Sequence, residues 1–290
     1  KGKDKSDTEK YQQEKRYDSI FAPIAISEGC DFSCSYCITT MARGSLNSYP
    51  ISAITNDVIS ALEQRCKEIQ LTAQDTASYG RDSNSSLADL LDNLGKIPGQ
   101  YRYRVGMMNP ATVLPQLQML IKAYENEHIY KFLHLPIQSG DDTLLKMMGR
   151  NYQIDDVLQI IDQFRNHYST LTLATDVIVG FPSETEIQHQ KTMELMTLLK
   201  PDIVNITKFS ARPNTKAKTM EKRIPTDIVK KRSKALTTLT AQLSLEKNKS
   251  YIGKEFSVLI TERGKNNTMI GRTDNYKPVV LKESVSIGEV

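Results

Sequence analysis

Three of the four cysteines in this chain lie on one short stretch, in the spacing C-x-x-x-C-x-x-C. They are Cys30, Cys34 and Cys37, and the six residues between the first and the last are few enough for one loop to wrap around a single metal centre. A cubane 4Fe–4S cluster held by three cysteines keeps one iron open. An open iron binds a substrate, whereas a fully ligated cluster only passes electrons. The triad is therefore the candidate catalytic and metal-ligating set.

Two other uses of the same cysteines stay open. A structural zinc site normally takes four ligands, and no further Cys or His lies close to the triad in sequence, which weakens that alternative. A cluster that senses redox state without turnover would need the same three thiols. The remaining Cys66 stands alone before an apolar segment, so we expect it to be a small buried apolar residue. Three cysteines in one loop argue against a disulfide framework and favour a reducing, cytoplasmic compartment.

The elements that must position the triad follow an alternating pattern. From Ile20 onward, short apolar runs alternate with amphipathic segments, which predicts repeated β-α units and a parallel sheet. Six strands are expected, over residues 20–27, 68–72, 101–106, 129–135, 171–179 and 203–209. Apolar spacings of three and four predict helices over residues 51–62, 114–124, 154–164 and up to 199, the last capped by Ser183 or Thr185.

The chain divides into three predicted parts. Residues 1–18 are polar and charged, which indicates a linker or disordered terminus. Residues 19–247 form the α/β core and end with a long helix that begins after Pro225. In residues 248–290 the apolar period changes to two, which predicts a small β-domain. We expect this domain to be incomplete at Val290, and we expect the natural protein to extend before Lys1.

Polar residues and glycines gather where the predicted strands end. Gln74 and Asp75 follow the second strand, Gln138 and Ser139 the fourth, and Gly180 the fifth. The carboxyl ends of parallel strands in a β/α barrel converge on one face, so these positions predict a site there. The bland alternatives are that Asp75 only caps its loop and that Gly180 is an ordinary turn glycine.

Charge adds a weaker signal. The net charge is +4 with a pI near 8.7, and basic residues are concentrated between Lys208 and Lys234 with only two acids among them. This stretch can bind phosphates or be a solvated helix face, and charge alone does not decide between the two. No run approaches the roughly 20 apolar residues that a membrane span needs, so no membrane contact is expected.

Several segments carry a resemblance to a known family. The cysteine loop with Tyr36 before its last cysteine resembles the radical S-adenosylmethionine (SAM) superfamily, and residues 71–76, 134–140 and 175–185 are similar to its methylthiotransferases. Residues 77–80 and 104–110 resemble the archaeal and eukaryotic branch that acts on threonylcarbamoyladenosine in tRNA. The resemblance implies a partial (β/α)6 TIM-like barrel followed by a small RNA-binding TRAM domain.

It also implies cofactors and roles. Cys30, Cys34 and Cys37 would hold one 4Fe–4S cluster with an open iron, and SAM would bind beside it. Gln74 or Asp75 would receive the ammonium group of SAM, and the backbone from Ile178 to Gly180 would pack against adenine. Arg43 and Arg150 would meet a carboxylate or an RNA phosphate. The residues expected to line the SAM pocket are Tyr36, Gln74, Asp75, Gln138, Ser139, Ile178 and Gly180.

The implied reaction is methylthiolation at carbon 2 of threonylcarbamoyladenosine next to the anticodon, started by a 5'-deoxyadenosyl radical. The implied partners are the tRNA anticodon loop and an electron-donor protein. In this family the sulfur comes from a second 4Fe–4S cluster in an N-terminal domain that this sequence lacks, so we expect SAM cleavage without sulfur insertion. The alternatives are a methylthiotransferase for isopentenyladenosine or a ribosomal protein, and a non-catalytic iron–sulfur RNA-binding sensor.

Overall fold

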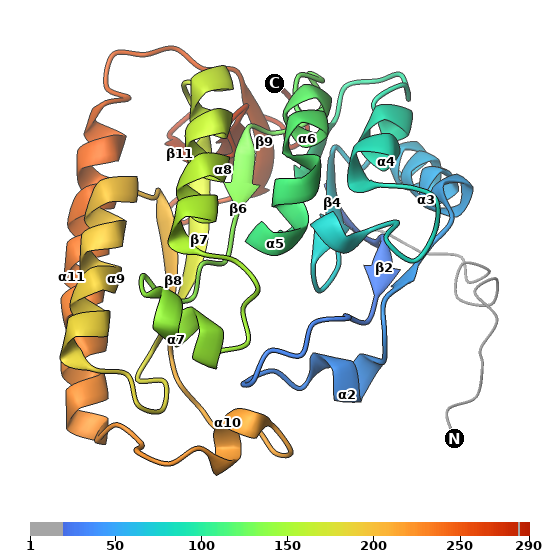
Figure 1. Ribbon diagram of the computed structural model, residues 1–290. Helices are drawn as coiled ribbons and strands as arrows, with labels where there is room; N and C mark the ends of the chain where they lie inside the picture. Colours follow the sequence, from blue (N-terminus) through green and yellow to red (C-terminus); the bar gives the residue numbers. More distant parts are fainter. Residues whose placement is uncertain (1–19, 284) are drawn as a thin grey trace.

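Six parallel strands form the framework of the computed structural model, which describes residues 20–283 and 285–290 (Figure 1). They lie in two three-stranded sheets, ordered β1-β4-β5 and β6-β7-β8, and a parallel bridge between Tyr103 and Ile129 joins the two. The strands are β1 (Phe21–Ala25), β4 (Glu68–Thr72), β5 (Arg102–Val105), β6 (Phe132–His134), β7 (Thr172–Val179) and β8 (Ile203–Lys208). All six predicted strands are confirmed, while the predicted terminus at 1–18 lies outside the described residues.

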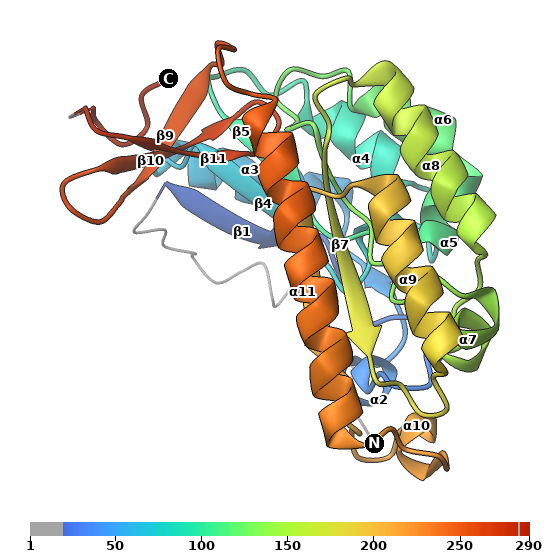
Figure 2. The same cartoon turned by 90° about the vertical axis from the view of Figure 1, so that its left-hand side faces the viewer.

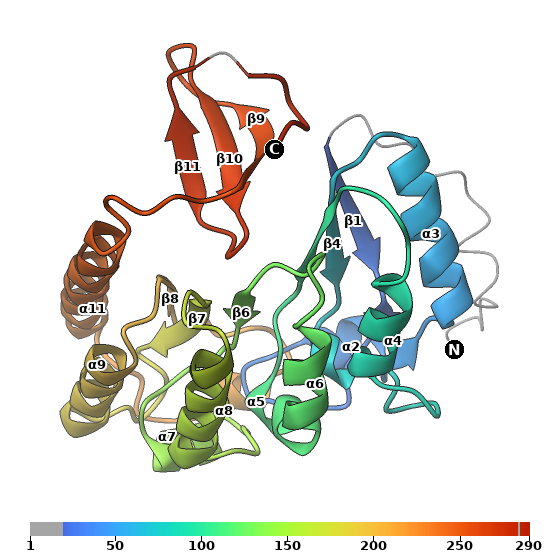
Figure 3. The same ribbon diagram turned by 90° about the horizontal axis from the view of Figure 1, so that it is seen from above.

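Helices connect these strands, and most of them cover the convex side of the arc that the strands form (Figure 3). They are α2 (Thr39–Arg43), α3 (Ile51–Glu63), α4 (Leu87–Leu94), α5 (Pro110–Val113), α6 (Leu117–Ala123), α7 (Asp142–Met147), α8 (Ile154–His167), α9 (Glu186–Leu199), α10 (Lys216–Thr219) and α11 (Thr226–Lys249). The helix predicted over residues 114–124 is interrupted, because Pro115 sits in a 3-10 turn between α5 and α6. Thr185 caps α9 in a capping box with Gln188, whereas Ser183 is a positive-φ turn residue.

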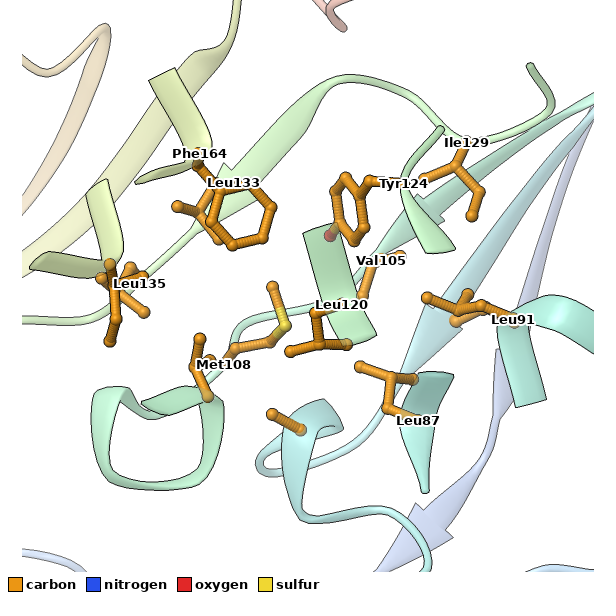
Figure 4. Packing of buried hydrophobic residues seen from close by; sticks show 14 of the residues in the cluster. Leu87, Leu91, Val105, Met108, Leu120, Tyr124, Ile129, Leu133, Leu135 and Phe164 are labelled. Atoms are coloured by element: carbon orange, nitrogen blue, oxygen red, sulfur yellow. The ribbon is translucent and has the colours of Figure 1, made fainter. Parts of the chain in front are cut away.

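The main core lies between the strands and these helices. Leu133 and Leu135, in β6 and just after it, pack with Leu120 and Tyr124 of the α6 region and with Phe164 of α8 (Figure 4). The rings of Tyr124 and Phe164 meet edge to face with centroids 5.4 Å apart. Burial of apolar side chains on this side fixes the register of the strands. The register in turn determines where each strand ends and its loop begins.

The strands bury only one of their two faces fully. In β4, Ile69 and Leu71 are completely buried against the helices, while Gln70 and Thr72 point to the opposite face and are partly exposed. Strand β5 and the carboxyl-terminal half of β7 repeat this alternation, whereas β8 alternates between exposed and partly buried side chains. A parallel sheet normally has both faces covered. Here the inner face of the arc stays partly accessible and carries polar side chains.

A three-stranded antiparallel sheet follows α11. It contains β9 (Val258–Arg263), β10 (Met269–Thr273) and β11 (Pro278–Leu281), in agreement with the predicted change of period. Figures 1 and 2 show it at one end of the barrel strands, with α2 and α10 at the other end.

The turn between β10 and β11 seats this sheet on the barrel. The ring of Tyr276 lies 4.9 Å from that of Phe132, and its hydroxyl donates a hydrogen bond to Glu68 Oε1 at 3.2 Å. The N–H of Lys131 donates to the carbonyl of Asp274 at 2.9 Å. Glu68 and Phe132 begin β4 and β6, so the turn enters the amino-terminal end of the barrel.

Within the described parts of the chain, none of the helices combines the length and the apolar character that crossing a membrane requires.

Candidate functional site

The cysteine loop leaves the carboxyl end of β1 through a short extension, β2 (Ser27–Glu28), which pairs with β3 (Asn47–Ser48). Gly29 at the start of the loop has φ +74°, and a Cβ there would lie 1.9 Å from the carbonyl oxygen of Ser45. Only glycine fits this close approach. The N–H of Cys30 then donates to the carbonyl of Gly44 at 3.2 Å, so the two ends of the loop are held together.

Two distant segments hold the middle of the loop. The N–H of Ser35 donates to the carbonyl of Met148 at 2.9 Å, and its hydroxyl donates to the carbonyl of Met147 at 3.0 Å. The N–H of Ala217, in α10, donates to the carbonyl of Ser35 at 2.7 Å. The loop is therefore tied to the end of α7 and to α10 as well as to its own base.

The three thiols differ in their surroundings. Burial raises the pKa of Cys30, and the nearby Asp75 and the other two cysteines add to the rise. Cys37 is exposed, and its sulfur contacts the Thr39 hydroxyl at 3.0 Å. Among residues 20–283 and 285–290, no three His, Cys, Asp or Glu side chains are gathered closely enough to hold a single metal ion. A cubane cluster binds each cysteine through a different iron, so its ligands need not converge on one point.

Arg150 reaches the triad from the segment after α7. Its Nη1 lies 3.6 Å from Cys34 Sγ, its Nη2 donates to Asn109 Oδ1 at 3.1 Å, and its Nε donates to the Tyr152 hydroxyl at 3.0 Å. Burial alone would lower the pKa of Arg150, but Tyr152, Tyr36 and Cys34 hold it above its usual value. The guanidinium is therefore a fixed positive charge beside Cys34.

The apolar side of the predicted pocket is assembled below the loop. Tyr36 and Ile178 both pack on a small cluster that contains Phe181, and the rings of Tyr36 and Phe181 meet edge to face at 6.5 Å. The N–H of Ile178 donates to the carbonyl of Gln138 at 3.0 Å, and Gln138 has φ +74°. Two loops and the end of β7 thus bring three of the predicted pocket residues to one place.

Gln74 and Asp75 have different environments. The Asp75 carboxylate accepts hydrogen bonds from the N–H groups of Ala77 and Asn109 and from the hydroxyls of Ser78 and Thr112, at 2.6–3.2 Å. These donors occupy it, and burial raises its pKa. The Gln74 Oε1 is buried and has no hydrogen-bond partner. Of the two residues, Gln74 has the free acceptor.

The other predicted residues are placed as follows. The Ser139 hydroxyl accepts from the N–H of Asp141 at 3.2 Å within its own turn. Gly180 has φ +80°, and a Cβ there would lie 2.5 Å from a methyl group of Val229 in α11. The close approach that requires glycine is therefore made by a helix and not by a ligand. Arg43 is exposed and only 3.8 Å from Glu28.

The basic stretch needs one correction. Its lysines and arginines between residues 208 and 231 are exposed, but Arg232 is buried. Arg232 Nη1 donates to Glu184 Oε2 at 2.8 Å, and the same carboxylate oxygen accepts from the N–H of Gly180 at 2.9 Å. Arg232 thus holds the Gly180 turn and is not available to a phosphate. The sequence did not predict this pair, because 48 positions separate its members.

Comparison with known proteins identifies the architecture. Residues 24–196 match the radical SAM superfamily, and residues 249–290 match the TRAM domain. The chain belongs to the radical SAM superfamily. Solved radical SAM enzymes share its fold: coproporphyrinogen III oxidase from Escherichia coli superposes with a TM-score of 0.57 at 13% identity, covering 97% of this chain and 71% of that one. The methyltransferase TsrM from Kitasatospora setae gives 0.56 at 14%, covering 68% and 36%.

Curated relatives of this radical SAM chain are closer in sequence. A protein named probable threonylcarbamoyladenosine tRNA methylthiotransferase from Archaeoglobus fulgidus is 44% identical over 92% of the chain, and one from Methanocaldococcus jannaschii is 46% identical over 93%. A Drosophila melanogaster protein, named threonylcarbamoyladenosine tRNA methylthiotransferase, is 38% identical over 92%. The chain spans 63%, 62% and 48% of these relatives, respectively. The family resemblance and the predicted fold class are confirmed.

The residues present fit the cofactors of a radical SAM protein. Three thiols project from one fixed loop, with a fixed guanidinium beside one of them. The unpartnered Gln74 Oε1 follows the next strand and suits an ammonium group, since a buried acceptor without a donor is costly. A positive φ at Gln138 and the hydrogen bond to Ile178 turn this backbone at the same end of the barrel.

Proposed function

We propose that this chain is the SAM-cleaving core of a tRNA methylthiotransferase that acts on threonylcarbamoyladenosine. The observation that carries the proposal is the cysteine triad on a fixed loop, in a chain that is 44–46% identical to archaeal proteins of that name. Cys30, Cys34 and Cys37 hold one 4Fe–4S cluster with an open iron. When bound, the cluster and SAM supply a 5'-deoxyadenosyl radical.

The protein residues bind and orient SAM in this proposal. Gln74 accepts a hydrogen bond from its ammonium group. Tyr36 and Ile178 provide an apolar wall, and the backbone from Ile178 to Gly180 packs against adenine. Asp75 and Ser139 act indirectly, by fixing the loops that carry Gln74 and Gln138.

The RNA side of the proposal uses two surfaces. The exposed basic residues between Lys208 and Lys231 contact phosphates around the mouth of the barrel, and the TRAM domain contacts the same RNA. The substrate is an anticodon loop, where a base can be unstacked at low cost. An electron-donor protein reduces the cluster, and the reaction takes place in the cytoplasm.

The second cluster lies outside these 290 residues. The only cysteine beyond the triad is Cys66, which is buried at 1% exposure in the core. One thiol cannot replace a three-cysteine site. The chain by itself is therefore expected to cleave SAM without transferring sulfur to RNA.

Anaerobic reconstitution with iron and sulfide tests the proposal. We expect a brown 4Fe–4S protein that forms 5'-deoxyadenosine from SAM when dithionite is added. Cys34→Ala should lose both the absorbance and the product, while the matched control Cys66→Ala should keep both. A colourless zinc protein, or a cluster that is inert towards SAM, would contradict the proposal and favour a structural or sensing role. Methylthiolated tRNA made by this chain alone would contradict the placement of the second cluster.

A further inference from the structure

The inner face of the barrel strands has the character of a substrate chamber. On β4, β5, β6 and β7 the side chains that face the helices are buried, and those of β8 are partly buried. Toward the carboxyl ends of the strands, the alternate side chains on the other face are partly or fully exposed. The inner residues that can form hydrogen bonds are Gln70, Thr72, Arg104, His134, Asp176, Asn205 and Thr207. An apolar substituent would leave the buried, unpartnered Nε of Arg104 unpaired, so the face suits a polar ligand.

Three of these residues form a hydrogen-bond network across β6, β7 and β8. His134 Nε2 lies 2.9 Å from Asp176 Oδ2, and the Asn205 side-chain amide donates to Asp176 Oδ1 at 2.7 Å. Burial alone would raise the pKa of Asp176, but the hydrogen bond from His134 and the nearby Arg150 hold it below its usual value. The aspartate charge is therefore balanced within the protein. Ile178, of the proposed SAM pocket, follows on the same face of β7 about 6.6 Å further toward the mouth.

Arg104 is the cation of this face without an acidic partner. Its guanidinium lies over the rings of Phe132 at 5.2 Å and Tyr276 at 5.9 Å, and its Nε is buried with no hydrogen-bond partner. In the described chain no carboxylate lies within ion-pair distance of Arg104. The buried acid Glu68, at the start of β4, is engaged by Gln70 and by the hydroxyls of Tyr130 and Tyr276. A buried donor on a fixed cation is suited to a carboxylate ligand.

We propose that the inner face binds the substituent on N6 of the target adenosine, and that Arg104 pairs with its carboxylate. This inference rests on the proposed function and names what distinguishes the substrate. A threonylcarbamoyl group carries a carboxylate, a hydroxyl and a urea-like linkage, whereas an isopentenyl group has none of these. Carbon 2 and N6 both lie on the Watson–Crick edge of adenine, on either side of N1, so a base with carbon 2 at the mouth brings its N6 substituent to the same opening, from which the substituent extends along the inner face.

A purely structural role for Arg104 makes a different prediction. Stacking on Phe132 and Tyr276 would stabilise the contact between the barrel and the TRAM turn regardless of which RNA is bound. Loss of Arg104 would then weaken the binding of all RNAs equally, or would lower only the melting temperature of the protein. If Arg104 pairs with a substrate carboxylate, its loss weakens the binding only of the RNA that carries this carboxylate.

The test compares RNAs that differ in one charge. Anticodon stem-loops carrying threonylcarbamoyladenosine, or its neutral methyl ester, are titrated by fluorescence anisotropy into the reconstituted chain. We expect the wild-type chain to bind the acid about tenfold more tightly than the ester. Arg104→Gln should reduce that ratio to about twofold or less with the ester affinity unchanged, and Arg104→Lys should keep part of it. Arg102→Gln is the matched control, because Arg102 is on the same strand and already paired with Asp274 at 3.1 Å.

Each result decides the question. The inference is overturned if the wild-type chain shows no preference for the acid, or if Arg104→Gln loses the same affinity for both RNAs. If Arg104→Gln does not fold, the wild-type ratio and the Arg104→Lys variant still decide. Formation of 5'-deoxyadenosine in the absence of RNA is measured separately, so failure of the proposed SAM cleavage is distinguishable from failure of substrate recognition.

Discussion

The buried pair of Arg232 and Glu184 leads to a sharp prediction about stability. The two side chains are 7% and 2% exposed, and Glu184 also accepts the N–H of Gly180. Arg232→Met keeps the apolar stem but leaves the carboxylate buried without its cation. Removing one partner of such a pair costs about 3–5 kcal/mol. For a chain of this size that lowers the melting temperature by roughly 6–20 °C.

The chain contains a matched control for this change. Arg232 also pairs with Glu186 at 2.9 Å, but that carboxylate is 75% exposed. Exposed pairs are worth at most about 1 kcal/mol, so Glu186→Gln should barely move the melting temperature. Both variants are measured by calorimetry or circular dichroism on the cluster-free protein. If Glu186→Gln costs as much as Arg232→Met, burial is not what makes the pair important and the reasoning is refuted.

The dependence on pH provides a second check. Burial raises the pKa of Glu184 in the folded protein even with Arg232 present. A carboxyl group whose folded pKa is above its unfolded value destabilises the fold as pH rises through that unfolded value, near 4.3. Loss of Arg232 raises the folded pKa further. The cost of Arg232→Met should therefore be largest at neutral pH and shrink on acidification toward about pH 4.5, and an equal cost at both pH values would contradict this account.

Three further predictions follow from single contacts. Arg150→Met removes a positive charge 3.6 Å from Cys34 Sγ, so the reduction potential of the reconstituted cluster should fall in a redox titration followed by electron paramagnetic resonance. Tyr276→Ala should cost roughly 3 kcal/mol in urea denaturation, and Tyr276→Phe about 1, because only the latter keeps the ring in the barrel. Gly29→Ala should prevent cluster assembly, seen as lost absorbance, since its Cβ would meet Ser45.

The fold was predictable because burial follows local period. The apolar runs of the six strands and the long helix after Pro225 are visible in any short window of sequence. The interruption at Pro115 was also visible in principle, since proline lacks the N–H that the helix needs. Helix α4 was not predicted, although Ser86 caps it and Leu87, Leu90, Leu91 and Leu94 follow the helical period.

The site was predictable only where its chemistry is local. The cysteine spacing is contained in eight residues, and it indicates the loop that we propose to bind the cluster. Asp75 stood beside Gln74 as an equal candidate for the ammonium group, and only the four donors around its carboxylate separate the two. Arg150 and Cys34 are 116 positions apart, so their contact depends on the packing of α7 and not on any pattern in the chain.

The TRAM turn and the cysteine loop lie at opposite ends of the barrel. Tyr276 packs with Tyr130 and Phe132 at the amino-terminal end of the barrel. These aromatic rings close that end, and we call them its floor. The cysteine loop and the exposed basic residues lie at the other end, where Figures 1 and 2 show α2 and α10. A ligand of the inner face must therefore enter from the cysteine side. The guanidinium of Arg104 lies over the ring of Tyr276 in this floor, so the domain that we propose to contact RNA also fixes the depth at which a substrate carboxylate would be met.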